Sequence, residues 1–216
     1  MQFGPNPNAV YPNENIKSVC YIKNVITRPN IIIGDYTYYD DIGGAERFEE
    51  HVTHHYDFLG DKLIIGKFCA IAKGIEFVMN GANHRIRSVT TYPFNIMGHG
   101  WEKAMPTMED LPFKGDTVVG NDVWIGQNVT VMPGVQIGDG AIVAANSVVT
   151  KNVPAYHVAG GNPVRIIKKR FDDDLIQYLL ELKWWDWPAR KIFDNLEALC
   201  SGDLTEIRRI QGGKDA

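Results

Sequence analysis

The stretch VVGNDVWIGQNVTVMPGVQIGDGAIVAANSVV, residues 118–149, decides the fold. Within it a Val or Ile returns at every sixth position, and a small or β-branched residue follows four positions after each. The first series is Val119, Ile125, Val131, Ile137, Val143 and Val149, and the second is Val123, Val129, Val135, Ala141, Ser147 and Val153. A fixed period over a contiguous stretch indicates a repeat architecture, and six-residue units are typical of a parallel β-helix.

The six-residue unit predicts a short strand followed by a turn, with alternate side chains pointing inward. Three units would close one triangular coil of about 18 residues, and successive coils would stack about 4.8 Å apart. The register then places Val119 against Ile137, Ile125 against Val143, and Val131 against Val149. Gly and Asn recur at the predicted corners, where they suit tight or left-handed turns.

The pattern divides the chain into three parts. We expect residues 1–30, rich in Pro and Asn, to wrap the body as an N-terminal segment. The β-helix is predicted over 31–170, with inserted loops at 35–62 and 80–117 where the period fails. A structureless segment longer than about 15 residues inside a compact domain is usually functional. Residues 171–216 predict a small C-terminal tail of helices, so the fold class is all-β with C-terminal α.

Helical periodicity supports this view of the tail. Leu175, Ile176, Leu179, Leu180 and Leu182 form an apolar stripe on a helix predicted over 172–183. A second helix is predicted to open at Asp186, with Pro188 in its first turn, and to bury Ile192, Phe193, Leu196 and Leu199. Asp203 and Glu206 resemble a capping box for a third helix. Trp184, Trp185 and Trp187 lie at the corner between the first two helices, where we expect them to pack against the coil.

Composition excludes several classes of function. The net charge of −4 and the absence of a basic stripe argue against nucleic-acid binding. Three cysteines are too few and too scattered for a disulfide framework, and Cys69 is expected to be buried. No secretory signal or membrane-spanning stretch is visible, so a soluble, cytoplasmic protein with no membrane partner is predicted.

His84 is the candidate for chemistry. It lies in Met79-Asn80-Gly81-Ala82-Asn83-His84-Arg85, where the repeat ends and the long loop begins. Loops mounted on a rigid scaffold concentrate catalytic groups. A neutral imidazole can remove a proton from a hydroxyl at neutral pH, so we predict that His84 is a general base.

Two other kinds of site are disfavoured. A zinc site built from histidines would need several of them on adjacent coils, but the regular coils over 118–154 contain none. His54 and His55 are adjacent and would point apart on a strand. A nucleophilic triad lacks its Gly-x-Ser-x-Gly elbow, and Ser147 is expected to face inward. We therefore predict neither a metal site nor a nucleophilic triad.

Several motifs together resemble a known family. The hexapeptide-repeat acyltransferases share the repeat motifs at 120–126, 132–135, 137–141 and 160–163. Tyr38-Tyr39-Asp40, Asn80 through Arg85, Trp101-Glu102-Lys103 and Met105-Pro106 add to these. This set resembles the xenobiotic acetyltransferases, and within them the streptogramin A (virginiamycin) O-acetyltransferases, over nearly the whole chain.

The resemblance implies a left-handed β-helix and a homotrimer with active sites between subunits. Acetyl-coenzyme A would lie along the coil, and the acceptor hydroxyl of a streptogramin A antibiotic would attack the thioester directly, with His84 as the base. Backbone N–H groups near Gly126 and the Ala144-Ala145 turn would bind the oxyanion. Coenzyme A contacts are expected from Gly126, Ala144, Ala145, Thr150, Lys151, Lys168, Lys169 and Arg170. A large, partly apolar acceptor suits aromatic and Met side chains, and the candidates are Tyr38, Tyr56, Met105, Pro106, Leu111 and Trp124, the last expected at a corner of the coil.

Three alternatives stay open at this point. The acceptor could be another hydroxylated small molecule, such as chloramphenicol or a sugar, because relatives differ mainly in the loop between Asn80 and Lys114. A non-catalytic trimeric scaffold would show no thioester turnover. A carbonic anhydrase of the β-helix type would contain zinc.

Overall fold

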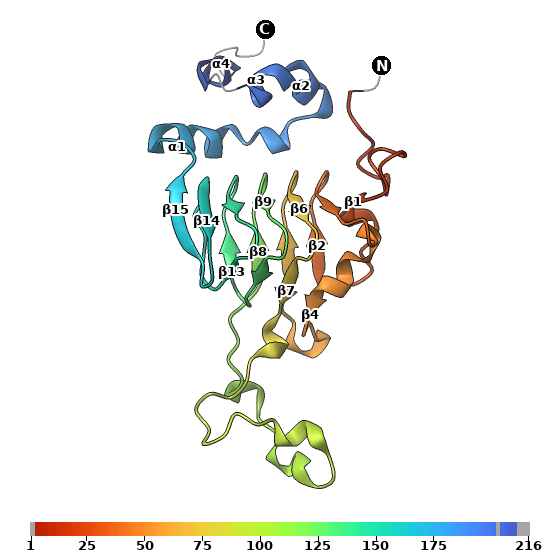
Figure 1. The fold of residues 1–216 in the computed structure, drawn as a ribbon, viewed down its shortest axis with the longest axis vertical. Coiled ribbons are helices and arrows are strands. Elements are labelled where there is room, and N and C mark those ends of the chain that lie inside the picture. The colour runs from red at the N-terminus through yellow and green to blue at the C-terminus, as the bar shows by residue number, and fades with distance from the viewer. Residues whose placement is uncertain (1–2, 202–203, 211–216) are drawn as a thin grey trace.

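The computed structural model describes residues 3–201 and 204–210 of the 216-residue chain. Within these ranges the chain winds into a coil whose strands form three sheets, the faces of a triangular prism, with helices along one edge (Figure 1). No helix in the described part of the chain is both long and apolar enough to cross a bilayer.

Each face takes one strand from every turn of the coil. The seven-stranded face holds β1 Val19–Tyr21, β3 Tyr38–Asp40, β6 Ala70–Ala72, β9 Trp124–Ile125, β12 Ile142–Val143, β14 His157–Gly160 and β15 Arg165–Lys169. The β10 face holds β4 Val52–Thr53, β7 Glu76–Val78, β10 Thr130–Val131 and β13 Val148–Val149. The β8 face holds β2 Ile31–Ile33, β5 Leu63–Ile65, β8 Thr117–Val119 and β11 Gln136–Ile137. Neighbouring strands pair in parallel except β1 with β3 and β14 with β15, at the two ends of the seven-stranded face.

The predicted register is confirmed on all three faces. Val119 pairs with Ile137, Ile125 with Val143, and Val131 with Val149. These six side chains are at most 2 % exposed and form continuous inward rows. Burying one such side chain stabilises a fold by roughly 1.5–3 kcal/mol, which explains why the repeat keeps Val or Ile at this position. The small positions Ala141 and Ser147 are also fully buried, and so is Cys69, as expected.

The three edges of the prism differ in what covers them. The helix edge, between the β8 face and the seven-stranded face, includes Lys67 and Phe68, which contact Asp186 and Trp184 of the tail. The turn edge, between the seven-stranded face and the β10 face, consists of short turns such as 126–129 and 144–147. The loop edge, between the β10 face and the β8 face, carries residues 79–116.

The segment 79–116, called the acceptor loop below, contains no strand. It holds the 3₁₀ turns η4 Asn80–Ala82, η5 Phe94–Met97, η6 Trp101–Ala104 and η7 Met108–Asp110. In Figure 1 it extends below the prism, on the side opposite the C-terminal helices.

The interpretation of 35–62 as a loop is wrong for two of its stretches. Tyr38–Asp40 and Val52–Thr53 are strands that pair with β6 and β7, so this segment completes a turn of the coil. Its excursion is limited to η2 Ala45–His51, whose Phe48 is fully buried, and η3 Asp57–Leu59.

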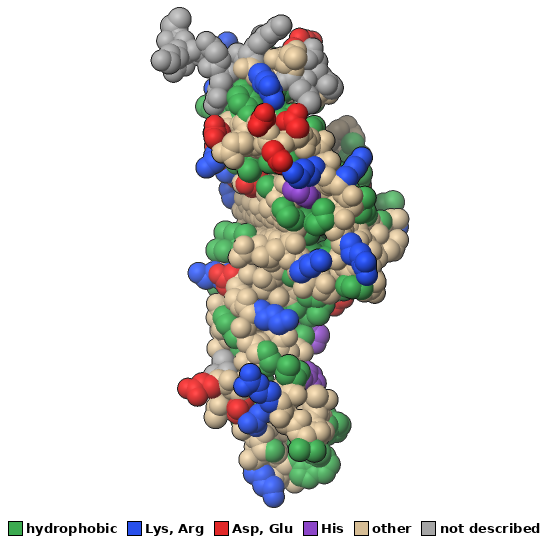
Figure 2. All heavy atoms as spheres, turned by 90° about the vertical axis from the view of Figure 1, so that its left-hand side faces the viewer, with side chains coloured by type: hydrophobic (Ala, Val, Ile, Leu, Met, Phe, Trp, Pro, Cys, Tyr) green, Lys and Arg blue, Asp and Glu red, His purple; other side chains and the backbone are tan. Residues whose placement is uncertain are grey.

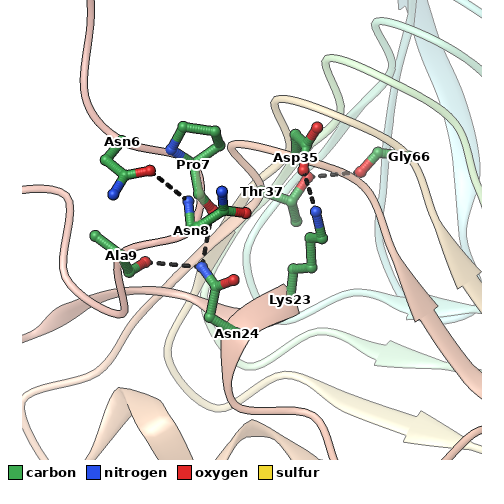
Figure 3. A network of polar contacts seen from close by, with 9 residues as sticks. All are labelled: Asn6, Pro7, Asn8, Ala9, Lys23, Asn24, Asp35, Thr37 and Gly66. Atoms are coloured by element: carbon green, nitrogen blue, oxygen red, sulfur yellow. Dashed lines mark hydrogen bonds and ion pairs between the residues drawn. The ribbon is translucent and has the colours of Figure 1, made fainter.

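The N-terminal segment is fastened to the first turn of the coil through η1 Ile22–Asn24. The Asn24 amide donates to the carbonyl oxygens of Pro7 and Ala9 at 2.9 and 2.7 Å (Figure 3). Thr37 Oγ1, also drawn there, donates to the Gly66 carbonyl oxygen at 2.6 Å and links the first two coils.

The first tail helix forms as expected and the second does not. Helix α1 Asp173–Leu182 begins after Asp172, whose carboxylate accepts from the Leu175 N–H at 2.8 Å. Trp184–Asp186 forms a separate 3₁₀ turn, η8, which buries Trp185 against the cluster around Tyr156. Helix α2 therefore opens later, as Ala189–Asp194, and α3 Leu196–Cys200 follows a break at Asn195.

That break turns two of the predicted buried side chains outward. Phe193 is 46 % exposed and Leu196 is 44 % exposed, whereas Ile192 and Leu199 are half-buried. Helix α4 Leu204–Arg209 occupies the place of the predicted third helix, and Asp203 of its expected capping box lies outside the described residues.

Candidate active site

The His84 imidazole is exposed on the acceptor loop and held in one orientation. Its Nδ1 lies 2.8 Å from the carbonyl oxygen of Thr91. A carbonyl oxygen can only accept, so Nδ1 carries the proton in this contact and the lone pair is at Nε2. An imidazole fixed in this tautomer presents Nε2 as a proton acceptor, as a general base requires.

The acceptor loop also exposes large apolar side chains. The Tyr92, Phe94 and Trp101 rings pack edge to face, with centroids 4.8 and 5.0 Å apart, and Met105 beyond them is 64 % exposed. Figure 2 shows hydrophobic side chains gathered over this end of the molecule. Exposed patches of this kind mark interaction or ligand sites.

Four of the six predicted acceptor residues lie on this loop or at its base. Met105, Pro106 and Leu111 belong to the loop itself. Tyr56 precedes η3, and its ring lies so close to Gly81 that a Cβ there would be 2.4 Å from Tyr56 Cδ2. A residue with a side chain at position 81 would push Tyr56 away from the beginning of the loop.

Tyr38 and Trp124 lie elsewhere, on the outer surface of the seven-stranded face. Tyr38 pairs with Ala70, and Ala70 pairs with Trp124, so the small Ala70 separates two aromatic side chains in one row. Trp124 is 56 % exposed and begins strand β9, so its expected corner position is wrong. The outward row and the acceptor loop are separate regions within one chain.

Two hollows in the described part of the chain do not include His84 in their lining. One of about 180 Å³ at the loop base is lined by Leu59, Asn80, Leu111, Pro112 and Phe113. It is smaller than the roughly 300–1,000 Å³ of typical ligand sites. A hollow of about 470 Å³ lies on the β8 face, lined by Gln136, Asp139 and Asn152 among others, and includes none of the predicted site residues.

The candidates for the oxyanion site lie on the turn edge. Gly126 and the Ala144-Ala145 turn stack directly, since a Cβ on Gly126 would be 2.6 Å from Ala145 N. The Gly126 N–H donates to Val143 O at 2.9 Å and the Ala144 N–H to Ala159 O at 2.8 Å. Both groups are therefore used to hold the coil, which leaves the Ala145 N–H as the better candidate.

The predicted coenzyme A cations lie in different settings. Lys151 is exposed on the loop edge beside Thr150, and Lys168 is exposed in β15. Lys169 pairs with Asp173 of α1 at the surface. The Arg170 guanidinium instead faces the protein, between the Tyr156 and Phe171 rings and 4.0 Å from the Asp122 carboxylate. Its role within the chain is to join β15 to the coil.

A titratable group at this junction is perturbed. Burial raises the pKa of the Asp122 carboxyl from 3.8 to about 6, with Arg170 opposing the rise and Asp139 adding to it. Among the residues that the structure describes, no group of three His, Cys, Asp or Glu side chains could hold a metal ion.

One chain does not bring the base and the oxyanion candidates together. His84 belongs to the loop edge and Ala145 to the turn edge, separated by the width of the β10 face. A face of about six residues spans up to roughly 20 Å at strand spacing. The acceptor loop also extends away from the prism in Figure 1. The class of protein defined so far is a parallel β-helix that carries an exposed, oriented histidine on a loop outside its core.

Comparison with known proteins identifies the family to which this β-helix belongs. The family model "Bacterial transferase hexapeptide (six repeats)" matches residues 116–151. A probable macrolide acetyltransferase of Lysinibacillus sphaericus is 61 % identical over 82 % of this chain and 99 % of its own. The virginiamycin A acetyltransferase of Staphylococcus aureus is 51 % identical over 95 % of this chain and 93 % of its own. Relatives at 39–41 % identity carry the name chloramphenicol acetyltransferase.

A solved structure is similar as well. A hexapeptide-repeat acetyltransferase of Vibrio cholerae, complexed with acetyl-coenzyme A, aligns over 67 % of this chain and 62 % of its own, at 30 % identity and a TM-score of 0.46. The chain belongs to the hexapeptide-repeat xenobiotic acetyltransferase family and is an acetyltransferase. Its parallel faces and C-terminal helices fit the left-handed β-helix expected from the resemblance.

Proposed function

We propose that this enzyme acetylates a hydroxyl of streptogramin A antibiotics of the virginiamycin M type, with acetyl-coenzyme A as donor, and so inactivates them. The observation that carries the proposal is the 51 % identity to a virginiamycin A acetyltransferase over nearly the whole of both chains. The exposed aromatic and Met side chains of the acceptor loop support a large, partly apolar acceptor.

The proposed reaction is a direct transfer. His84 Nε2 takes the proton of the acceptor hydroxyl while the hydroxyl oxygen attacks the thioester carbonyl carbon. The tetrahedral oxyanion accepts a hydrogen bond from the Ala145 N–H of the coil. Collapse breaks the carbon–sulfur bond, and the imidazolium returns its proton to the coenzyme A thiolate. The products are the acetyl ester and free coenzyme A.

The arrangement of the edges supports an active site shared between subunits. Because His84 and Ala145 lie on different edges, a second copy of the chain must bring its turn edge to the acceptor loop of the first. A closed ring of three copies gives three equal sites of this kind. We therefore propose a homotrimer, with Tyr38 and Trp124 of one subunit contacting an acceptor that also contacts a neighbour's loop.

The remaining site assignments follow from this geometry. Pantetheine would run along the turn edge past Gly126 and Ala144. Its phosphates would meet exposed cations such as Lys168 of the same chain, or Lys151 on the loop edge of the neighbouring copy. Arg170 is the weakest of the predicted phosphate ligands because its guanidinium is already engaged. Since acetyl-coenzyme A is a metabolite of the cell interior, the proposed place of action is the cytoplasm.

Chloramphenicol is the second candidate acceptor, because relatives at 39–41 % identity are named for it. The test is a thiol-release assay with acetyl-coenzyme A against virginiamycin M, a macrolide, chloramphenicol and a galactoside. The proposal expects the highest kcat/KM with virginiamycin M. A higher kcat/KM with chloramphenicol would identify chloramphenicol, and not virginiamycin M, as the acceptor. No thiol release with any acceptor would contradict the assigned activity.

A further inference from the structure

The two ends of the acceptor loop are fastened to each other by polar contacts. The Asn83 amide donates to Pro112 O at 2.7 Å, and the Arg85 guanidinium pairs with the Asp110 carboxylate at 2.8 Å. Asn80 contacts the end of the loop nearest the coil. We call residues 80–85 and 110–115 the loop stem.

Asn80 links the two segments of chain in this stem at the end nearest the coil, and both its side-chain oxygen and its side-chain nitrogen take part. Nδ2 donates to Gly115 O at 2.9 Å, while Oδ1 accepts from Lys114 N at 2.8 Å and from Asn83 Nδ2 at 3.3 Å. Asn80 is only 4 % exposed, so water competes little for these hydrogen bonds. One side chain thus joins segments about 35 residues apart in the sequence.

Asp61 holds Asn80 from the side of the coil. Its side chain is fully buried, and Oδ2 accepts from both Asn80 N and Asn80 Nδ2, at 3.0 and 2.8 Å. Asp61 lies two residues before strand β5, so it is anchored close to the coil. Hydrogen bonds to a buried carboxylate are stronger than neutral ones, and leaving such a group unpaired is costly.

His84 lies between two crossings of the stem, one at Asn83 and one at Arg85. From this geometry we infer that Asn80 and Asp61 are positioning residues, which fix the stem to the coil and thereby hold the His84 imidazole in its reactive place. The inference rests on the proposed role of His84 as the base. A displacement of about 1 Å in a catalytic group can lower a rate by about 10²-fold.

The test compares Asn80→Ala with Asn24→Ala. Asn24 is a matched control because its amide also joins two backbone carbonyls, but in the N-terminal segment (Figure 3). Kinetics are measured well below the melting temperature of each variant. For Asn80→Ala we expect kcat to fall by about 10–100-fold, whereas the KM for acetyl-coenzyme A stays within about twofold. Asn24→Ala should keep wild-type kcat.

A second measurement needs no substrate. Trypsin can cut after Arg85 and Arg87, and mass spectrometry identifies the fragments. Cutting there should be at least about tenfold faster in Asn80→Ala than in wild type or Asn24→Ala, because an unfastened stem opens more often. If Asn80→Ala fails to fold, Asp61→Asn replaces it. That variant keeps an oxygen for the Asn80 amides and should show a smaller change of the same kind.

The outcomes separate the inference from the proposed function. Unchanged kcat in Asn80→Ala, or unchanged trypsin cutting, overturns the positioning role. Equal losses in Asn80→Ala and Asn24→Ala show a general structural effect and overturn it as well. Full activity in His84→Ala instead rejects the base, while the trypsin result still reports on the stem.

Discussion

The coil and the acceptor loop treat apolar side chains in opposite ways. In the coil, Ile125 and its stacked neighbours Ile71 and Val143 are buried, and each turn of the coil places an apolar side chain in the same inward row. In the loop, Ile86 is 76 % exposed and Val89 fully exposed, without a repeat or a strand. The inward rows of the coil are covered within one chain, whereas the loop leaves large apolar side chains exposed. Stability and chemistry are therefore separated in the sequence.

The largest effect should come from the loop. We expect His84→Ala to lower acetyl transfer by about 10²–10⁴-fold, since this is the usual contribution of a general base. Because the imidazole is exposed and its hydrogen bond within the described residues is the one to Thr91 O, melting temperature and oligomeric state should not change. Stopped assays of thiol release, with light scattering for the mass, check both expectations. Activity near the wild-type rate would contradict the mechanism.

A substitution inside the coil should have the opposite effect, lowering stability and not activity. Ile125→Ala should lower the free energy of unfolding by about 2–5 kcal/mol, because the side chain is fully buried between Ile71 and Val143. Urea unfolding gives the value, and the folded fraction should keep a normal kcat. Ile32→Ala is the control: Ile32 is 45 % exposed on the same prism, so the loss should stay below about 1 kcal/mol.

Trp124 sharpens the comparison because it is a coil residue with an exposed ring. Trp124→Ala should raise the KM for the acceptor about tenfold, equivalent to about 1.4 kcal/mol of lost contact, with little change in stability. Steady-state kinetics with the acceptor varied provide the measurement. Ile42→Ala removes a side chain that is 93 % exposed, and it should leave this KM unchanged. A stability loss without a KM change would assign Trp124 to packing.

The smallest effect concerns pH and the junction of coil and tail. The folded-state pKa of Asp122, about 6, lies above its ordinary 3.8, so the folded state binds this proton more tightly. Its contribution to stability is then present below about pH 4 and is lost as pH rises through about 6. Asp122→Asn cannot ionise, and Asn tolerates the positive φ of 56° there. Its stability relative to wild type should therefore be higher at pH 7.5 than at pH 5, by urea unfolding at both. A relative stability that is equal or lower at pH 7.5 contradicts the raised pKa.

The sequence was sufficient to predict the coil in detail because its period is local and strict. Each inward position follows the previous one by six residues, so the pairing of Ile125 with Val143 needs no three-dimensional information. The same rule explains the error over 35–62. Tyr39 keeps the step of six after Ile33, but it is neither Val nor Ile. The insertion of η2 then delays the next inward residue on a strand to Val52.

The candidate site was only partly predictable. His84 could be found because it stands where the period ends. Thr91, which orients its ring, could not be found, since a carbonyl oxygen in an irregular loop leaves no mark in the sequence. The role of Asp61 was missed for a similar reason: its partner is 19 residues away, and an acid near a turn ordinarily implies solvent. The second tail helix was misplaced because the burial of Trp185 took precedence over the capping preference of Asp186.

The number of stacked coils also fixes the length of each edge of the prism. Removal of one whole coil, such as residues 120–137, would rejoin the chain in phase and leave the remaining rows paired, but it would shorten the turn edge by one strand spacing, about 4.8 Å. Removal of six or twelve residues from the regular coils over 118–149 would instead move every later strand onto another face. If the donor binds along this edge as proposed, the length available to it changes in discrete steps with the number of coils.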